Sequence, residues 1–179
     1  VKDMTTEETI EISREFGRYL GSLGVPVYYY EDAATRPERT NLVNIRKGQY
    51  EALPEKMKNE EWHPDEGPFE FVPKSGATVT GVRFPLVAFN VNLRTDDIDL
   101  GKKIVKAVRG ATGGYQYVRA IALPIEEGKM IQISMNLTNY AKTPIHRVFE
   151  TVKSEALSYG VQVAGTELVG PVPLDALKD

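Results

Sequence analysis

The chain contains two histidines, the residue type best suited to acid–base chemistry near neutral pH. His63 lies in a segment of weak periodicity, where a solvated loop histidine is the alternative to a catalytic one. His146 follows Thr143 and Pro144, which we expect to be the N-cap and the first residue of a helix. The positive end of a helix dipole disfavours imidazolium there, so a neutral capping or packing role competes with catalysis.

Amide and hydroxyl side chains alternate with apolar ones along two expected strands, residues 85–93 and 130–137. The polar positions are Asn90, Asn92, Gln132, Ser134 and Asn136. Because successive side chains of a strand point to opposite faces, these five share the face that lies away from the apolar residues. Such a face suits hydrogen bonding to a polar ligand, and the alternative is that it simply meets solvent.

Three arginines, Arg36, Arg39 and Arg46, form a basic group on the long irregular segment. Guanidinium groups bind carboxylates through two parallel hydrogen bonds, so this group is a candidate site for an acidic ligand. The alternative is pairing with acidic residues nearby in sequence, which are Glu31, Asp32 and Glu38.

No pattern predicts a metal site. The chain has no cysteine, which also excludes disulfides and thiolate catalysis. Neither histidine belongs to a His-Glu-x-x-His pattern. Asp96, Asp97 and Asp99 resemble a metal-binding cluster, but capping of the helix that follows explains them better. No nucleophile–base pair can be named from spacing.

Residues 67–83 form the stretch around which the rest of the chain is expected to be organised, and they are a candidate binding segment. Two prolines and two glycines among residues 67–76 hold this peptide away from helix geometry, so its backbone polar groups are not all used in regular structure. Trp62, the sole tryptophan, lies five residues upstream and could help to form the wall of a site for a flat ligand. The alternative is a linker between domains.

The first part of the chain shows a helix, a strand and then weak periodicity. Thr5 and Glu8 form a capping box, and the helix that follows is expected to bury one apolar stripe. That stripe consists of Ile12, Phe16, Leu20 and Leu23. Residues 25–29 read as a strand, and residues 31–76 hold at most one short helix, near residues 47–58.

The second part is more regular. A strand is expected at residues 78–82, followed by a strand (85–93), a helix (96–109), two strands joined by a hairpin (117–125 and 130–137), a helix, and a strand (161–168). From residue 85 the order is β-α-β-β-α-β, the ferredoxin-like arrangement, with both helices on one face of an antiparallel sheet. We therefore predict an α+β fold with domains at residues 1–76 and 77–179.

Composition excludes several classes of protein. The chain of 179 residues is 41% hydrophobic and 26% charged, which is typical of a globular protein. Its net charge is −3, and basic residues alternate with acidic ones, so no nucleic-acid partner is expected. No apolar run is long enough for a membrane span, and no signal peptide is evident. We therefore expect a cytoplasmic protein with no membrane partner.

Seven stretches, taken in order, resemble one family. They are VPVYYY (25–30), IRKGQYE (45–51), WHPDEGP (62–68), GATVTGVR (76–83), AFNVNL (88–93), QISMNL (132–137) and LVGPVPL (168–174). Together they resemble glutamate formiminotransferase, including the transferase part of formiminotransferase-cyclodeaminase. The resemblance covers nearly the whole chain, and no stretch resembles the cyclodeaminase.

The resemblance implies a transferase of histidine degradation. Such an enzyme moves a formimino group from N-formimino-L-glutamate to tetrahydrofolate, giving 5-formiminotetrahydrofolate and L-glutamate. It implies tetrahydrofolate as co-substrate, no metal, small-molecule partners and a homodimer. It also implies two ferredoxin-like subdomains with a folate tunnel between them, so that residues 1–76 would be the C-terminal part of the first.

The family's folate-binding segment matches Gly67, Pro68, Phe69, Glu70, Phe71, Val72, Pro73, Lys74, Ser75 and Gly76. We expect the five polar strand residues to line the tunnel. Glu66 stands where the family often has an aromatic residue, and Lys74 and Ser75 lie at variable positions. The family's catalytic histidine lies before the point that matches Val1, and neither His63 nor His146 corresponds to it. A chain that begins at Val1 is therefore expected to lack transferase activity.

Two alternatives stay open at this point. One is a non-catalytic module that binds folate or another metabolite on a ferredoxin-like scaffold. The other is a structural piece that dimerises through its open sheet face. Folate binding would separate the two.

Overall fold

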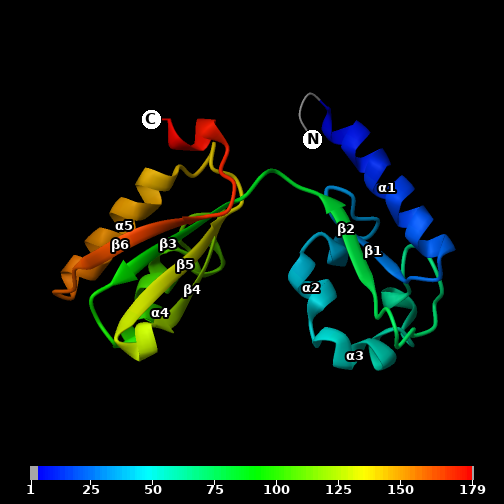
Figure 1. Ribbon diagram of the computed structural model, residues 1–179, viewed down its shortest axis with the longest axis horizontal. Coiled ribbons are helices and arrows are strands. Elements are labelled where there is room, and N and C mark those ends of the chain that lie inside the picture. Colours follow the sequence, from blue (N-terminus) through cyan, green and yellow to red (C-terminus); the bar gives the residue numbers. More distant parts are fainter. Residues whose placement is uncertain (1–3, 179) are drawn as a thin grey trace. The chain divides into compact units, whose positions relative to one another are not determined.

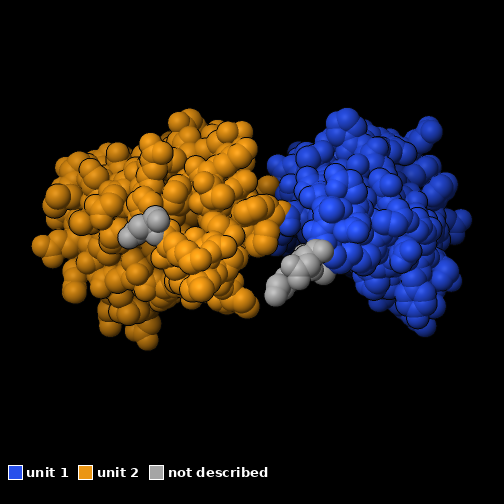
Figure 2. All heavy atoms as spheres, turned by 90° about the horizontal axis from the view of Figure 1, so that it is seen from above, with its two compact units in different colours: residues 1–83 blue, residues 84–179 orange. Residues whose placement is uncertain are grey.

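The computed structural model describes residues 4–178. The chain forms two compact units, residues 1–83 and residues 84–179 (Figure 2). Each unit has its own sheet, and both mix helices with strands, which confirms the α+β class. No helix among the described residues is long and apolar enough to cross a membrane.

Helix α1 (Thr6–Ser22) begins at the predicted capping box. The Thr5 hydroxyl accepts from Glu8 N at 3.1 Å, and Glu8 Oε2 accepts from Thr5 N at 2.8 Å. The predicted buried stripe is largely wrong. Ser13 and Gly17 are the buried residues of α1, and Leu20 is partly buried. Small residues face the sheet because α1 approaches it closely: a Cβ on Gly17 would lie 2.3 Å from the Tyr29 hydroxyl.

The exposed side of α1 is apolar instead. Ile12, Phe16, Tyr19 and Leu23 are between 46% and 62% exposed. Their spacing of four, three and four residues places them on one face of the helix. Periodicity therefore located an apolar face correctly, but it could not show whether that face meets the sheet of unit 1.

The sheet of unit 1 pairs β1 (Val27–Glu31) with β2 (Thr78–Val82) in parallel, with Val27 opposite Thr78. Helix α1 covers one face of this pair, and α2 (Leu42–Arg46) and α3 (Gln49–Lys56) lie on the other side (Figure 1). Helix α3 lies where the single short helix near residues 47–58 was predicted, and α2 is an additional helix that the sequence pattern did not predict. Gly48, with φ of +85°, separates them.

The placement of β2 moves the boundary between the two parts of the chain. The sequence-based boundary falls between residues 76 and 77, whereas the structural units meet between residues 83 and 84. The difference arises because β2 pairs with β1, about fifty residues earlier in the chain. Local periodicity identifies a strand but carries no information about its distant partner.

Unit 2 contains six regular elements in the predicted order. They are β3 (Val87–Leu93), α4 (Ile98–Val108), β4 (Val118–Ile125), β5 (Met130–Leu137), α5 (Ile145–Ser158) and β6 (Val163–Val169). The four strands lie in the order β4-β5-β3-β6, and each neighbouring pair is antiparallel. Both helices cover the same face of this sheet (Figure 1).

The core of unit 2 lies between that face and the two helices. The buried stripes of the helices are Ile104, Val105 and Val108 from α4 and Val148, Val152 and Ala156 from α5. They pack against alternate residues of β3 and β5, all at most 5% exposed: Val87, Phe89, Val91, Leu93, Ile131, Ile133, Met135 and Leu137. The alternation predicted for these strands is confirmed.

The N-termini of α4 and α5 show one correct and one wrong prediction of a helix cap. Asp97 caps α4, because its Oδ1 accepts from Asp99 N at 2.9 Å and from Leu100 N at 3.0 Å. At α5 the expected cap was wrong by one residue. Pro144 is the N-cap and makes no side-chain capping bond, while Thr143 is buried at 4% exposure.

Candidate functional site

The segment formed by residues 67–76 is irregular, and unit 1 holds it in place through aromatic side chains. The Tyr50 hydroxyl of α3 donates to Pro73 O at 2.9 Å. The Tyr50 ring meets the Phe71 ring edge to face, with centroids 5.4 Å apart. Gly76 N donates back to Val72 O at 2.8 Å, which closes a turn at the end of the segment. The segment is thus fixed against α3.

The other aromatic contact of this segment involves His63. Its ring stacks on Phe69 with centroids 4.7 Å apart and an interplanar angle of 14°. Phe69 remains 59% exposed, so one ring supports another at the surface. The structure therefore makes His63 a packing partner of the candidate binding segment, which differs from both a freely solvated loop residue and an isolated acid or base.

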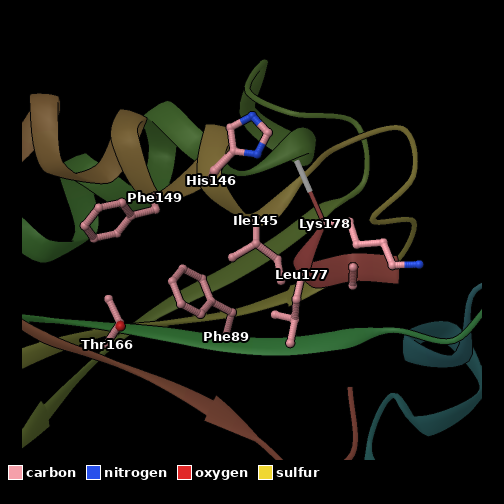
Figure 3. Close-up of a pocket in the computed structure, with 8 residues that line it drawn as sticks. Phe89, Ile145, His146, Phe149, Thr166, Leu177 and Lys178 are labelled. Atoms are coloured by element: carbon pink, nitrogen blue, oxygen red, sulfur yellow. The ribbon is translucent and has the colours of Figure 1, made fainter. Parts of the chain in front are cut away.

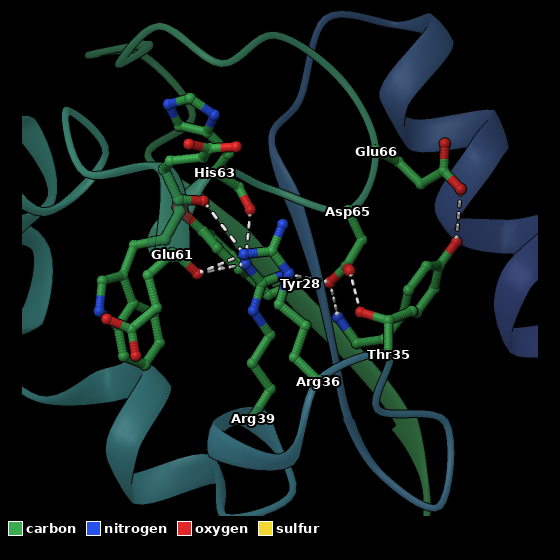
Figure 4. Close-up of polar contacts among 11 residues, drawn as sticks. Tyr28, Thr35, Arg36, Arg39, Glu61, His63, Asp65 and Glu66 are labelled. Atoms are coloured by element: carbon green, nitrogen blue, oxygen red, sulfur yellow. Dashed lines mark hydrogen bonds and ion pairs between the residues drawn. The ribbon is translucent and has the colours of Figure 1, made fainter.

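A buried ion pair fixes residues 61–65, which precede the candidate binding segment (Figure 4). Arg39 is 0% exposed, and its Nη1 lies 2.8 Å from Asp65 Oδ2. Its Nη2 donates to Glu61 O at 2.8 Å and to His63 O at 2.6 Å. Asp65 in turn accepts from the backbone N–H of Tyr29 in β1 at 2.8 Å. One guanidinium and one carboxylate thus tie the chain around residues 61–65 to the sheet.

Arg36 and Arg39 contact residues 60–65, which are distant from them in sequence. Arg39 pairs with Asp65, which lies far from it in sequence, rather than with Glu31, Asp32 or Glu38. Arg36 donates to the carbonyl oxygens of Glu60 and Glu61, at 3.1 and 3.0 Å. Arg46 borders a cavity.

This cavity of about 200 Å³ adjoins the end of the candidate segment. Its walls come from β1, the α2–α3 region and the start of β2: Tyr28, Ile45, Arg46, Gln49, Tyr50, Leu53, Ala77 and Val79. The Tyr28 hydroxyl donates to Trp62 O at 2.6 Å. Burial raises the pKa of Tyr28 to about 12, so this phenol is a neutral donor at physiological pH.

The segment also needs a glycine at its first position. Gly67 has φ of +84°, a conformation that L side chains rarely adopt, and a Cβ there would lie 2.3 Å from Val25 O. Beside it, the Tyr29 hydroxyl lies 3.2 Å from Glu66 Oε1 and 3.1 Å from Arg14 O of α1. Glu66 therefore has a structural contact with Tyr29.

The five polar strand residues lie in unit 2, on the sheet face opposite the helices, as the alternation predicted. Asn90 is 8% exposed and lies across from Ser134 of β5, while Asn92 lies across from Gln132. Gln132 Nε2 donates to Asn92 Oδ1 at 2.9 Å. The amides therefore form a connected surface rather than separate solvated side chains.

Sequence reasoning missed the carboxylate at the centre of this surface. Glu167 of β6 lies directly across from Asn90. Its Oε2 accepts from Asn90 Nδ2 at 3.5 Å and from Gln132 Nε2 at 3.2 Å, and its Oε1 accepts from Asn92 Nδ2 at 3.3 Å. The same alternation that located the amides, applied to residues 163–169, could have placed Glu167 on this face.

A further cavity, of about 270 Å³, lies on the helix side of the same unit (Figure 3). Phe89, Ile145, Phe149 and Leu177 supply its apolar walls, and the other lining residues are His146, Thr166, Ala176 and Lys178. His146 thus borders an apolar cavity and is separated from the polar face by the sheet. Among residues 4–178, no group of three or more histidine or carboxylate side chains could hold a metal ion.

Comparison with known proteins gives a consistent family for both units. Residues 1–83 match the formiminotransferase domain, N-terminal subdomain, and residues 88–179 match the formiminotransferase domain. The chain is 49% identical over 180 residues to the glutamate formimidoyltransferase of Streptococcus pyogenes and 46% identical over 182 residues to that of Thermoplasma acidophilum. It is 43% identical over 185 residues to the formimidoyltransferase-cyclodeaminase of Mus musculus.

These similarities extend over the whole of this chain but over only part of the relatives. The chain spans 60% of the length of the two microbial proteins and 34% of the length of the mouse protein. Because family models of the formiminotransferase domain match both units, the chain belongs to the formiminotransferase domain family.

Proposed function

We propose that the protein containing this chain transfers a formimino group from N-formimino-L-glutamate to tetrahydrofolate, giving 5-formiminotetrahydrofolate and L-glutamate. The observation that carries this proposal is the 49% identity, over the whole of this chain, to a protein named glutamate formimidoyltransferase. Tetrahydrofolate is then a co-substrate, and the reaction belongs to histidine degradation.

In this reaction the N5 nitrogen of tetrahydrofolate attacks the formimino carbon, and the bond from that carbon to the glutamate nitrogen breaks. A general base takes the proton from N5, and the leaving nitrogen receives a proton. Positioned acid–base groups accelerate such steps by about 10²–10⁴-fold, and holding two substrates in line supplies much of the rest. We assign neither His63 nor His146 to the acid–base role, since one stacks on Phe69 and the other borders an apolar cavity.

We infer that residues 67–76 bind folate. Tyr50 and His63 hold this segment through ring contacts, and Phe69 keeps an exposed ring face that suits a flat heterocycle. The polar face of unit 2 is our candidate for the tunnel lining, because its amides form a connected hydrogen-bonding surface. These two candidate sites belong to different units of the chain.

We also propose that unit 2 is a ferredoxin-like subdomain and that unit 1 is the C-terminal part of another. The element order of unit 2 and its strand order β4-β5-β3-β6 support the first assignment, and the match of residues 1–83 to the N-terminal subdomain supports the second.

A homodimer is proposed as well, supported by the exposed apolar stripe of α1. Sedimentation over a range of concentrations tests it, and a monomer at all concentrations would contradict it.

The test of the proposed function uses a full-length protein that contains this chain. We expect formimino transfer in the wild type. Replacing Asn90 or Gln132 with leucine should weaken tetrahydrofolate binding about tenfold or more, since each loses hydrogen bonds that a ligand needs. Gln116→Leu is the matched control, because Gln116 is exposed and lies outside the polar face.

The measurements are turnover, folate affinity and the melting temperature of each variant. Unchanged affinity in both leucine variants would remove these residues from the site. Folate binding without any turnover in the wild type would instead support the alternative, a non-catalytic folate-binding module. Wild-type protein that neither binds folate nor transfers the group would contradict both.

A further inference from the structure

We propose that Glu167 is the receptor on the polar face for a planar ligand group that carries two N–H donors on one carbon. The sequence pattern did not identify Glu167. The proposal comes from the contacts that Glu167 makes in unit 2. The identity of the natural ligand rests on the proposed function, while the chemistry of the receptor does not.

The three strands β5, β3 and β6 place Glu167 among three amide groups. Asn90 lies directly across from it, Asn92 is the diagonal neighbour on the same strand, and Gln132 reaches over from β5. Gln132 Nε2 also donates to Asn92 Oδ1 at 2.9 Å, which uses the Asn92 oxygen and turns its NH₂ group toward Glu167. The amide donors are therefore oriented around one carboxylate.

The bonds that Glu167 makes within the protein are long. They measure 3.2, 3.3 and 3.5 Å between heavy atoms, whereas charge-assisted N–H···O⁻ bonds are usually 2.7–2.9 Å. An ionised carboxylate offers about four acceptor positions, so three long bonds leave it with unused capacity. A ligand donor can therefore shorten or replace these contacts at little cost.

The charge of Glu167 is not matched by a basic side chain in the described part of the chain: no lysine, arginine or histidine there forms an ion pair with it. The amides supply dipoles but no positive charge. A cationic or strongly donating ligand group placed here would gain a charge-assisted interaction that the unliganded protein lacks.

The Glu167 side chain is exposed, and a carboxylate matches a planar pair of N–H groups, as in arginine–carboxylate pairs. Both substrates of the proposed reaction carry such a pair. The formimino group is an amidine, which is cationic when protonated and has two nitrogens on one carbon. The pyrimidine ring of tetrahydrofolate presents a ring N–H beside a 2-amino group. The amides around Glu167 can bond the remaining edge of either ligand.

The test compares Glu167→Gln with the matched control Glu150→Gln in full-length protein containing this chain. Both changes remove one negative charge from unit 2. Glu150 is on α5, which covers the opposite face of the sheet, and it pairs with Lys153 in an exposed i,i+3 contact. Glutamine retains the shape of glutamate, and melting temperatures verify that each variant is folded.

The first readout uses benzamidine, a planar amidinium that needs no transferase activity. In an NMR titration we expect it to shift the side-chain NH₂ signals of Asn90, Asn92 and Gln132 in the wild type and in Glu150→Gln. The shifts should be lost in Glu167→Gln. Absence of these shifts from the wild type, or their persistence in Glu167→Gln, would overturn the proposal.

The second readout identifies the natural group by calorimetry with tetrahydrofolate, N-formimino-L-glutamate and p-aminobenzoyl-L-glutamate, which lacks the pterin. A loss of about tenfold or more for tetrahydrofolate alone in Glu167→Gln would assign the receptor to the pterin edge. The same loss for N-formimino-L-glutamate alone would assign it to the amidine. Equal affinities of wild type and Glu167→Gln for every ligand would overturn the proposal even if the wild type is an active transferase.

The failure of the proposed function has a different signature. Wild-type protein that binds neither substrate but shows the benzamidine shifts, lost in Glu167→Gln, would contradict formimino transfer and still support the receptor.

Discussion

At the scale of single residues, Arg39 connects several parts of unit 1. Its guanidinium is fully buried and joins one carboxylate and two backbone carbonyls, and it also lies 5.1 Å from the centre of the Tyr28 ring. Removing one partner of a buried ion pair leaves the other charge without compensation, which costs far more than the pair itself contributes. The position of residues 61–65, which precede the candidate folate-binding segment, therefore depends on this side chain.

We expect Arg39→Met to lower the free energy of unfolding of unit 1 by about 3–5 kcal/mol, because Asp65 would remain buried and unpaired. Urea denaturation measures the loss. Arg36→Met is the control, since Arg36 makes only exposed contacts to backbone carbonyls and should cost about 1 kcal/mol or less. Equal losses in the two variants would show that the buried pair has no special role.

Tyr28 and Tyr29 should make stability depend on pH in the alkaline range. Burial raises the pKa of each to about 12 from a usual value of 10.0. The folded state then holds these protons more tightly than the unfolded state does, so stability is retained below pH 10 and falls as the pH rises toward 12. Chemical denaturation between pH 9 and 12 measures this decline.

The Tyr28→Phe variant should show a weaker decline, because its phenol no longer titrates. Tyr19→Phe is the control, since Tyr19 is 62% exposed on α1. Identical slopes for the wild type and Tyr28→Phe would contradict the assignment of a raised pKa to this side chain.

Tyr50 links α3 to the candidate folate segment. Removing its hydroxyl in Tyr50→Phe breaks the bond to Pro73 O but keeps the ring contact with Phe71. We expect a stability loss of about 0.5–1.5 kcal/mol and weaker tetrahydrofolate binding, because the segment is then less firmly positioned. Calorimetric affinity and melting temperature measure the two effects. Loss of stability with unchanged affinity would mean that this end of the segment does not contact folate.

At the scale of elements, the fit between α4 and the sheet depends on Gly101. A Cβ at this position would lie 2.6 Å from Ile131 Cγ2 and 3.0 Å from Ala122 Cβ, so the helix and the sheet approach too closely for any side chain. Glycine in a helix interior costs up to about 1 kcal/mol relative to alanine. The close packing of the two layers offsets this cost.

Substitution at Gly101 should therefore destabilise unit 2. Gly101→Val should lower the free energy of unfolding by about 2 kcal/mol or more, since overpacking typically costs 1–3 kcal/mol. Lys102→Val introduces the same residue on an exposed part of the same helix and should cost less than about 1 kcal/mol. The urea midpoints of the two variants measure these losses. A similar loss of stability in both variants would mean that the low helix propensity of valine, rather than overpacking at Gly101, causes the destabilisation.

At the scale of the whole chain, the two units differ in how much apolar surface they bury. Unit 2 has an extensive core between a four-stranded sheet and two helices, whereas unit 1 has a two-stranded sheet and a small apolar cluster of Val27, Tyr29 and Ala33. Burial of apolar surface is the main favourable term in folding. Local stability should therefore differ between the units.

Hydrogen exchange should reveal this difference. We expect amides of β5, which pairs with a strand on each side, to exchange more slowly than amides of β2. Mass spectrometry of exchanged peptides from the two strands measures the ratio. Equal protection of both strands, with a single unfolding transition, would contradict independent stability of the units.

Much of the fold was accessible from local pattern. Alternation along residues 85–93 and 130–137 predicted two strands and their buried faces, and the capping box at Thr5 predicted the start of α1. The errors concern contacts between distant segments. The stripe of α1 was assigned to the core because periodicity identifies an apolar face but cannot identify what covers it.

The candidate site divides in the same way. The sequence by itself determined the family, the polar face and the irregular segment 67–76, because each depends on residue types in a local order. Only the tertiary structure showed that Arg39 pairs with Asp65, that Tyr50 and His63 hold the segment, and that Glu167 faces three amides. Tyr50 and Pro73 lie 23 positions apart, and Glu167 and Asn90 lie 77 positions apart. Glu167 meets the amides through the pairing of β6, β3 and β5. No local periodicity records that pairing.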